Sequence, residues 1–381
     1  MLFTPGPTNV PLRILKALLE PMIHHRGEEF KNLYSELVEK LRELLKTDGE
    51  VLVLTSSGTG GIEMALANLV HRGDKVLAPI YGTFSERLAE AVEARGAVVV
   101  KRKLEPGVGL DSEGARALVE EHSDADFLLL VYNDTSPGVM LRELGEICRR
   151  ARDEGVMTIV DAISAVGGAP LEVDGWCIDV LVGASQKCIG APPGVSFVSF
   201  SEEALERAEK RRPSSAYFDL RAYRRSAKVL ETPYTPAVNL FRALLEALEM
   251  IFEIGRDNWI ALHEARAEAL YRALELLGFR PFVEPRFRSS TVLGLVPPDG
   301  VDPGLLKREL RERYGVCIAS GLGEFRNKIV RIGNMGSLSW RDLLVLAASL
   351  AEVLAHLGVE VDALAALRAV GEGARETGLA I

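Results

Sequence analysis

Short apolar runs that alternate with amphipathic segments constrain the fold of this chain more than any other feature. EVLVLT, VLAP, FLLLVY, VMTIVD and DVLVGAS have the pattern of strands, and helical patterns such as TFSERLAEAVEARG and RELGEICRRARDEG separate several of them. Strands that are apolar along their whole length are typical of a parallel sheet that helices cover on both faces. We therefore predict an α/β fold with a three-layer domain.

The pattern changes after two long helical segments near residues 239–277. STVLGLV, a helical segment near residues 302–314, VCIAS and KIVRIG indicate a smaller α+β domain. A chain of 381 residues is long enough to form more than one hydrophobic core. We expect an N-terminal arm over residues 1–15, a large domain over residues 16–254 and a small C-terminal domain over residues 255–381.

The composition excludes several classes of partner. The net charge is −9 and no long basic run occurs, so neither nucleic acid nor an anionic membrane surface is an expected partner. We find no apolar run long enough to cross a bilayer and no signal-peptide pattern. Cys148, Cys177, Cys188 and Cys317 are scattered, which argues against structural zinc and disulfides. We expect a cytoplasmic protein without a metal site.

The stretch VGASQKCIGAPPG places Lys187 directly after an apolar strand and before a loop of small residues and prolines. Most lysines are solvated surface charges, and Lys187 considered alone fits that interpretation. In a parallel α/β sheet, however, ligands bind at the carboxyl ends of the strands. Lys187 is therefore a candidate for an amine that takes part in chemistry.

Other strand ends carry residues that could act with Lys187. Asp161 closes the strand VMTIVD, Phe84 lies in YGTFSER, and the glycine-rich SSGTGG follows EVLVLT. Considered singly, Asp161 could cap a helix, Phe84 could be a core aromatic and SSGTGG could be an ordinary turn. SSGTGG matches neither the Walker loop nor GxGxxG, so it supports neither ATP nor a dinucleotide.

Together these residues meet the needs of pyridoxal phosphate. That cofactor requires a lysine for its aldehyde, an acid at its pyridine nitrogen, an aromatic ring to stack on and a phosphate-binding turn. The exposed amides at a helix start bind a phosphate well. The sequence supplies all four in a plausible order, so we predict pyridoxal 5'-phosphate as the cofactor.

TPGPTNVP, SSGTGG, the block from Asp161 to Gly194 and KIVRIGNMG resemble the class V aminotransferases, in particular the alanine–glyoxylate/serine–pyruvate group. The resemblance extends over nearly the whole chain. It implies the type I fold of pyridoxal-phosphate enzymes, with a mostly parallel seven-stranded sheet and a smaller C-terminal domain. It also implies a homodimer with shared active sites, and transamination between alanine or serine and glyoxylate or pyruvate.

The resemblance assigns roles around the cofactor ring. Lys187 would form the internal aldimine and Gln186 would lie beside the cofactor. Asp161 would pair with the pyridine nitrogen, Phe84 would stack on the ring and Thr135 would lie near the ring oxygen.

The resemblance also assigns roles around the phosphate. Thr59, Gly60 and Gly61 match the phosphate-binding turn, although for Gly61 it implies only backbone contact. Thr235 and, less closely, Thr232 match positions that reach the phosphate of the neighbouring subunit.

For the substrate, Arg331 matches the arginine that binds the carboxylate, a task that suits a guanidinium. His25 and Arg26 lie in HHRGEEF, at a place that lines the active site in relatives. A second cation there could bind a side-chain carboxylate and make aspartate the alternative donor. Alternatively, these two residues form a helix-start cluster paired with Glu28 and Glu29.

Two other functions share this fold. A cysteine desulfurase or related lyase needs a nucleophilic cysteine on an active-site loop. Cys317 lies in the strand pattern GVCIAS, and the following loop GLGEFRN has no cysteine, so we interpret Cys317 as a core residue. The resemblance also extends to chains described as hydrogenase subunits. The complete set of Lys187, Asp161 and Arg331 argues against such a non-catalytic role.

Overall fold

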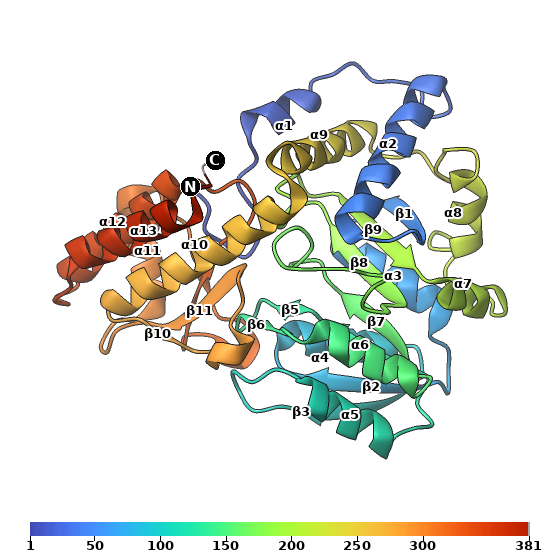
Figure 1. Cartoon of the computed structure of the whole chain (residues 1–381), viewed down its shortest axis with the longest axis horizontal. Coiled ribbons are helices and arrows are strands. Elements are labelled where there is room, and N and C mark those ends of the chain that lie inside the picture. The colour runs from blue at the N-terminus through green and yellow to red at the C-terminus, as the bar shows by residue number, and fades with distance from the viewer. Residues whose placement is uncertain (380–381) are drawn as a thin grey trace.

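The computed structural model describes residues 1–379 and has a larger and a smaller lobe (Figure 1). The larger lobe contains a seven-stranded sheet with the strand order β1-β9-β8-β7-β4-β2-β3. Its strands are β1 (Glu50–Thr55), β2 (Lys75–Ile80), β3 (Val98–Lys103), β4 (Phe127–Val131), β7 (Met157–Asp161), β8 (Val180–Ala184) and β9 (Val195–Phe200). Only β9 is antiparallel to its neighbours. The mostly parallel seven-stranded sheet that the family resemblance implies is confirmed.

Every residue of β4, β8 and β9 is buried, because helices cover both faces of this sheet. For example, α3 packs on β8 and β9, and α4 packs on β2 and β4. The helices of this lobe are α1 (Leu12–Ala17), α2 (Glu28–Leu45), α3 (Gly58–Leu69), α4 (Thr83–Glu93), α5 (Ser112–Glu121), α6 (Leu144–Asp153), α7 (Glu202–Glu209), α8 (Leu220–Ala227) and α9 (Val238–Ile254). A short hairpin of β5 (Asn133–Asp134) and β6 (Val139–Met140) follows β4.

The smaller lobe contains a four-stranded antiparallel sheet in the order β10-β11-β13-β12. Its elements are α10 (Arg256–Leu276), β10 (Arg280–Pro281), β11 (Val292–Val296), α11 (Pro303–Tyr314), β12 (Ala319–Ser320), β13 (Val330–Gly333), α12 (Trp340–His356) and α13 (Ala363–Thr377), with short 3-10 turns at Pro285–Phe287 and Gly323–Phe325. A second hydrophobic core lies between this sheet and the helices. The α+β pattern predicted for the C-terminal part is therefore confirmed, while the domain limits stay a prediction.

The N-terminal arm pairs with the smaller lobe. Phe3 is fully buried in the core of that lobe, its N–H donates to the carbonyl of Cys317 at 2.8 Å, and its carbonyl accepts from Gly333 at 2.8 Å. Cys317 is thus held by backbone pairing with the arm and is only half-buried. Our interpretation of Cys317 as a core residue was wrong in this respect, because its side chain is half-buried and belongs to none of the hydrophobic cores of the described residues.

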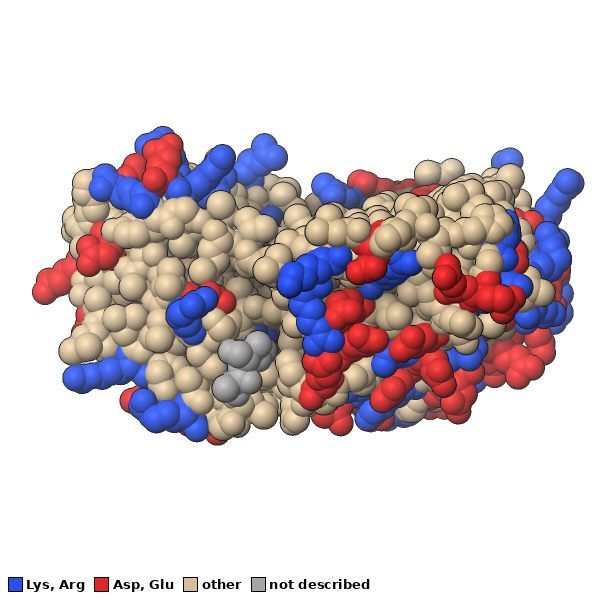
Figure 2. All heavy atoms as spheres, turned by 90° about the horizontal axis from the view of Figure 1, so that it is seen from above, with Lys and Arg blue, Asp and Glu red and all other residues tan. Residues whose placement is uncertain are grey.

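The face formed by α1 and α9, seen from above in Figure 2, carries basic and acidic side chains in mixed order. Arg13 of α1, for example, pairs with Glu246 and Glu253 of α9. None of the described helices combines the length and apolar character needed to span a bilayer. Residues 1–379 also contain no group of three or more histidine, cysteine or acidic side chains that could hold a metal ion.

Candidate active site

Residues from several strand ends line one cavity of about 250 Å³, which we call the lysine pocket. Asp161 ends β7, Gln186 and Lys187 follow β8, and the β4–β5 connection leads to Asn133 and Thr135. Helices α3 and α4 contribute further residues to the wall, from their first turns onward. Of the residues predicted for the site, six line this cavity, namely Thr59, Phe84, Thr135, Asp161, Gln186 and Lys187.

Lys187 is held with its amine inside the protein. Burial lowers the pKa of Lys187, and Arg331 acts in the same direction, whereas the carboxylate of Asp161 opposes the shift. The Nζ atom donates a hydrogen bond to the carbonyl of Pro5 in the N-terminal arm. A larger share of neutral amine is therefore present at neutral pH than for a solvated lysine, which suits a nucleophile or base.

Asp161 is a desolvated acid at the end of β7. Burial of its carboxyl group raises the pKa of Asp161 to about 6, and the nearby Asp134 acts in the same direction. Its Oδ1 atom accepts a hydrogen bond from the backbone N–H of Ile163 at 3.0 Å. No helix begins there, so Asp161 is not a helix cap. Lys187 acts on this carboxylate electrostatically, but no cation among residues 1–379 forms an ion pair with it, and a protonated ring nitrogen would supply such a partner.

Asp134 holds the start of α4, the helix that carries Phe84 into the lysine pocket, and it was not identified from the sequence. Its carboxylate accepts from the backbone N–H groups of Phe84 at 3.0 Å and Ser85 at 2.8 Å, so it caps the first turn of α4. Phe84 is half-buried and lines the pocket, and the guanidinium of Arg87 lies 5.5 Å from its ring centroid. Asp134 stands in NDTSPG beside Thr135, but the sequence gives no signal that it contacts α4.

The start of α3 lies at the same cavity. Gly58 and Thr59 line the pocket in the first helical turn, where backbone N–H groups have no partner within the helix. Gly60 follows in the same turn. Gly61 instead faces the sheet, since a Cβ atom there would lie 2.7 Å from Cγ1 of Val182. This close contact between helix and strand explains why position 61 is a glycine. Gly61 can therefore contact a bound group only through its backbone.

The lysine pocket fits pyridoxal phosphate. The side-chain oxygens of Asn133 and Gln186 are buried and have no hydrogen-bond partner among the described residues, so both can accept a bond from a bound group. An amine, an acid, an aromatic ring and a helix start surround the same space. These are the groups that the cofactor requires at its aldehyde, ring nitrogen, ring face and phosphate.

Arg331 lies next to the lysine pocket. It belongs to β13, and its guanidinium donates from Nη1 to the carbonyl of Thr135 at 2.9 Å and from Nε to the carbonyl of Ser320 at 2.7 Å. Burial lowers the pKa of Arg331 to about 10. The arginine therefore remains a cation at neutral pH, and two backbone bonds fix the plane of its guanidinium.

The other predicted residues lie outside this cavity. Thr232 is buried and its hydroxyl donates to the carbonyl of Tyr234 at 2.8 Å, whereas Thr235 is exposed. Arg26 forms an ion pair with Glu231 and donates to the carbonyl of Thr232 at 2.9 Å. The alternative in which Arg26 pairs with the adjacent glutamates is therefore wrong. His25 is half-buried and packs edge-on against His24.

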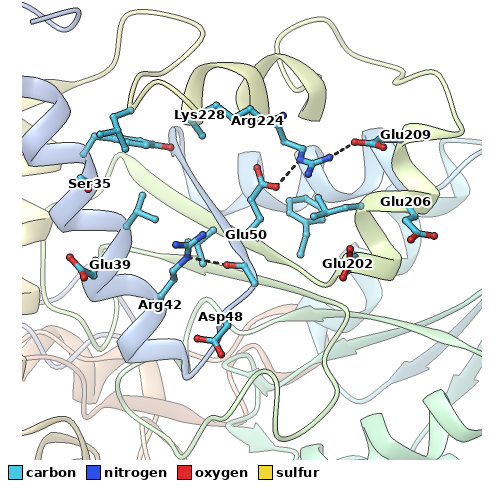
Figure 3. Close-up of a pocket in the computed structure, with 18 residues that line it drawn as sticks. Ser35, Glu39, Arg42, Asp48, Glu50, Glu202, Glu206, Glu209, Arg224 and Lys228 are labelled. Carbon is cyan, nitrogen blue, oxygen red and sulfur yellow. Dashed lines mark hydrogen bonds and ion pairs between the residues drawn. The ribbon is translucent and has the colours of Figure 1, made fainter.

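A larger cavity of about 710 Å³ lies elsewhere, and we call it the α2–α8 groove (Figure 3). It is formed by α2, β1, α7 and α8 and carries both acidic and basic side chains. Figure 3 shows Arg224 between Glu50 and Glu209, and ion pairs join it to both. None of the residues predicted for the site lines this groove.

Comparison with known proteins shows the family. The sequence model of the family described as "Aminotransferase class-V" matches residues 1–326. An uncharacterized aminotransferase of Methanocaldococcus jannaschii is 35% identical, with 95% of this chain and 94% of that protein covered. A serine–glyoxylate aminotransferase of Methylorubrum extorquens is 31% identical, with 100% and 97% covered.

Among solved structures, the ureidoglycine–glyoxylate aminotransferase of Bacillus subtilis superposes with a TM-score of 0.93. It is 29% identical, and the alignment covers 98% of this chain and 97% of that one. The predicted resemblance is thus confirmed over nearly the full length. Because both the sequence and the fold match, this chain belongs to the class V aminotransferases, enzymes that use pyridoxal phosphate.

Proposed function

We propose that the protein transfers the amino group of alanine or serine to glyoxylate or pyruvate, with Lys187 as the active amine. The observation that supports this proposal most directly is the presence of Lys187, Asp161 and Phe84 around one small cavity. Transamination between an amino acid and a 2-oxo acid is the general activity of the family. The choice of donor and acceptor and the role of each side chain are the proposed part.

Pyridoxal phosphate, when bound, supplies an electron-accepting ring that stabilises negative charge at the substrate Cα. In our proposal Lys187 would hold the cofactor and, as a free amine, would accept the proton from the substrate Cα and donate it to the cofactor carbon that carries the amino nitrogen. Its lowered pKa favours the neutral form that such proton transfer needs. Asp161 would hold a proton on the ring nitrogen, and the low polarity around its carboxyl group would strengthen that interaction.

Three further groups would orient the reacting molecules. The amides at the start of α3, with Thr59, Gly60 and Gly61, would bind the phosphate, which the helix dipole also attracts. Arg331 would bind the substrate carboxylate, because its guanidinium is fixed by two backbone carbonyls and stays charged. Thr135, whose carbonyl holds Arg331, would lie near the ring oxygen.

We also propose a homodimer in which Thr232 and Thr235 reach the phosphate of the neighbouring subunit. The exposed threonine and an apolar surface on and after α1 support it. This surface consists of Leu12, Leu15, Leu19 and Met22, with exposed fractions between 40% and 83%. An apolar patch of this kind is typical of a protein–protein contact.

The domain limits at residues 15 and 254 and a cytoplasmic location complete the proposal. Gly255 separates α9 from α10, which agrees with the second limit. The four cysteines are free in the structure, which agrees with a reducing compartment.

The contacts of Arg26 favour a small donor over aspartate. Glu231 neutralises its charge, so within one subunit Arg26 offers no free cation for a second carboxylate. A desulfurase is less favoured, because Cys317 does not line the lysine pocket.

A panel of amino donors tests the proposal. The protein loaded with pyridoxal phosphate is mixed with alanine, serine, aspartate or cysteine, and the visible absorbance of the cofactor is followed without an acceptor. We expect rapid bleaching with alanine or serine and recovery on addition of glyoxylate or pyruvate. Faster bleaching with aspartate would establish the alternative donor, and sulfide release from cysteine would establish a lyase. A chain that binds no cofactor would support the accessory role.

A further inference from the structure

The first nine residues form a closed loop rather than a free tail. Asn9 accepts from the backbone N–H of Leu2 at 3.0 Å and donates to the carbonyl of the same residue at 2.8 Å. At the base of this loop, Met1 and Phe3 pair with the backbone of Cys317, and Phe3 also pairs with Gly333. The loop is therefore closed by Asn9 and anchored to the smaller lobe at its N-terminal side, and we call residues 2–9 the clasp.

The tip of the clasp touches the active lysine. The carbonyl of Pro5 accepts a hydrogen bond from Nζ of Lys187, and the hydroxyl of Thr8 lies 3.4 Å from the carbonyl of Lys187. Gly6 has a positive φ of 98°, and a Cβ atom there would lie 2.6 Å from Cδ and 2.7 Å from Nζ of Lys187. Only a glycine leaves room for the lysine stem at this point.

The anchor of the clasp lies on the strand that carries the substrate-binding arginine. Gly333 follows Arg331 in β13, and a Cβ atom at Gly333 would lie 2.1 Å from the carbonyl oxygen of Thr4. The clasp therefore lies directly against this strand and is hydrogen-bonded to it through Phe3 and Gly333. Its tip is therefore held at a defined position over Lys187 by a part of the chain far from Lys187 in sequence.

We propose that the clasp is a positioning element for Lys187. The Pro5 carbonyl gives the free amine a fixed acceptor at the edge of the lysine pocket, and Gly6 allows this contact while covering the lysine stem. The role in the reaction rests on the proposed function of Lys187, whereas the covering of the amine does not. In each turnover, the free amine would return to this acceptor instead of sampling many rotamers, which keeps it close to the substrate Cα.

Chemical labelling of the full chain without cofactor tests the contact. Acetylation of Lys187 by acetic anhydride at neutral pH is followed by mass spectrometry, with the exposed Lys210 as the internal reference. In Gly6→Ala the new methyl group displaces the clasp or the stem, so we expect Lys187 to react at least threefold faster. Gly73→Ala is the matched control, because Gly73 has a similar φ of 90° and no neighbour within 4 Å of its Cβ position.

Asn9→Ala provides a second variant that opens the clasp without touching the lysine. We expect faster acetylation of Lys187 in this variant as well, and this variant decides the matter if Gly6→Ala does not fold. With the cofactor bound, Gly6→Ala should lower kcat by a larger factor than it raises KM for the donor, while Gly73→Ala should keep parental kinetics.

Parental acetylation of Lys187 in the folded variants would overturn the proposal. If the variants are acetylated faster but the parent protein does not transaminate, the proposed function is refuted, while the covering of Lys187 by the clasp is still supported. Faster acetylation with parental kcat in Gly6→Ala would refute the positioning role.

Discussion

The lysine pocket and the α2–α8 groove differ in how their charges are balanced. The groove is the larger of the two, yet Arg224 in it is paired with Glu50 and Glu209 near solvent. In the smaller pocket, Lys187 and Asp161 are desolvated and their pKa values move toward neutrality. Titratable groups with shifted pKa values indicate an active site better than the volume of a cavity does. Desolvation of a charged group without a matched partner costs stability, and such a group persists where the chemistry needs it.

The largest difference between the two regions should follow from loss of the lysine amine. Lys187→Ala removes both the group that binds the cofactor and the proton carrier, so we expect kcat to fall by at least about 10³-fold. Lys228→Ala in the α2–α8 groove is the control and should retain parental kcat. Comparable losses in both variants would erase the distinction between the two regions.

Substitution of the arginine beside the pocket should have the next largest effect. Arg331→Lys keeps the charge but loses the planar pair of donors, so KM for the amino donor should rise by about 10- to 100-fold. Steady-state kinetics with alanine and serine measure this change. A KM within twofold of the parent would show that another cation binds the carboxylate.

Asp161 can be tested through stability in the absence of cofactor. The folded pKa of about 6 lies above the unfolded value of about 3.9, so the folded chain binds an extra proton between these pH values. The parent should therefore lose about 1–3 kcal/mol of stability from this residue as pH rises from about 4 to 6. Asp161→Asn does not titrate, so urea unfolding should show its stability relative to the parent improving over that range. A constant difference would contradict the raised pKa.

The smallest effect is expected in the α2–α8 groove. Arg224→Ala breaks two partly exposed ion pairs and removes the packing of the side chain. Together these losses should lower the free energy of unfolding by at most about 1 kcal/mol. Transaminase activity should remain within twofold of the parent. A larger loss of activity would indicate that the groove takes part in function.

Much of the fold was readable because its strands are buried on both faces and therefore continuously apolar. The sequence pattern does not identify β3, because VVVKRK lies at the edge of the sheet, is largely exposed and ends in three basic residues. Helix α3 begins at Gly58, inside SSGTGG, which the sequence pattern presents only as a glycine-rich turn because glycines weaken the helical signal.

The site was predictable where residues follow strand ends or match a family motif, as for Asp161 and Lys187. Asp134 and the clasp were not, because their contacts join segments far apart in sequence. Asp134 reaches Phe84, and Pro5 reaches Lys187 across 182 positions. Nothing in the local sequence around Pro5 indicates that its carbonyl meets an amine.

The central claim is that Lys187 and Asp161 hold one pyridoxal phosphate between them. The most direct measurement is reduction of the cofactor-loaded protein with borohydride, followed by digestion and mass spectrometry to locate the pyridoxyl group. We predict that the group is attached to Lys187 in the parent and in Asp161→Asn, with weaker loading in the latter. Attachment to any other lysine, or no attachment at all, would contradict the account.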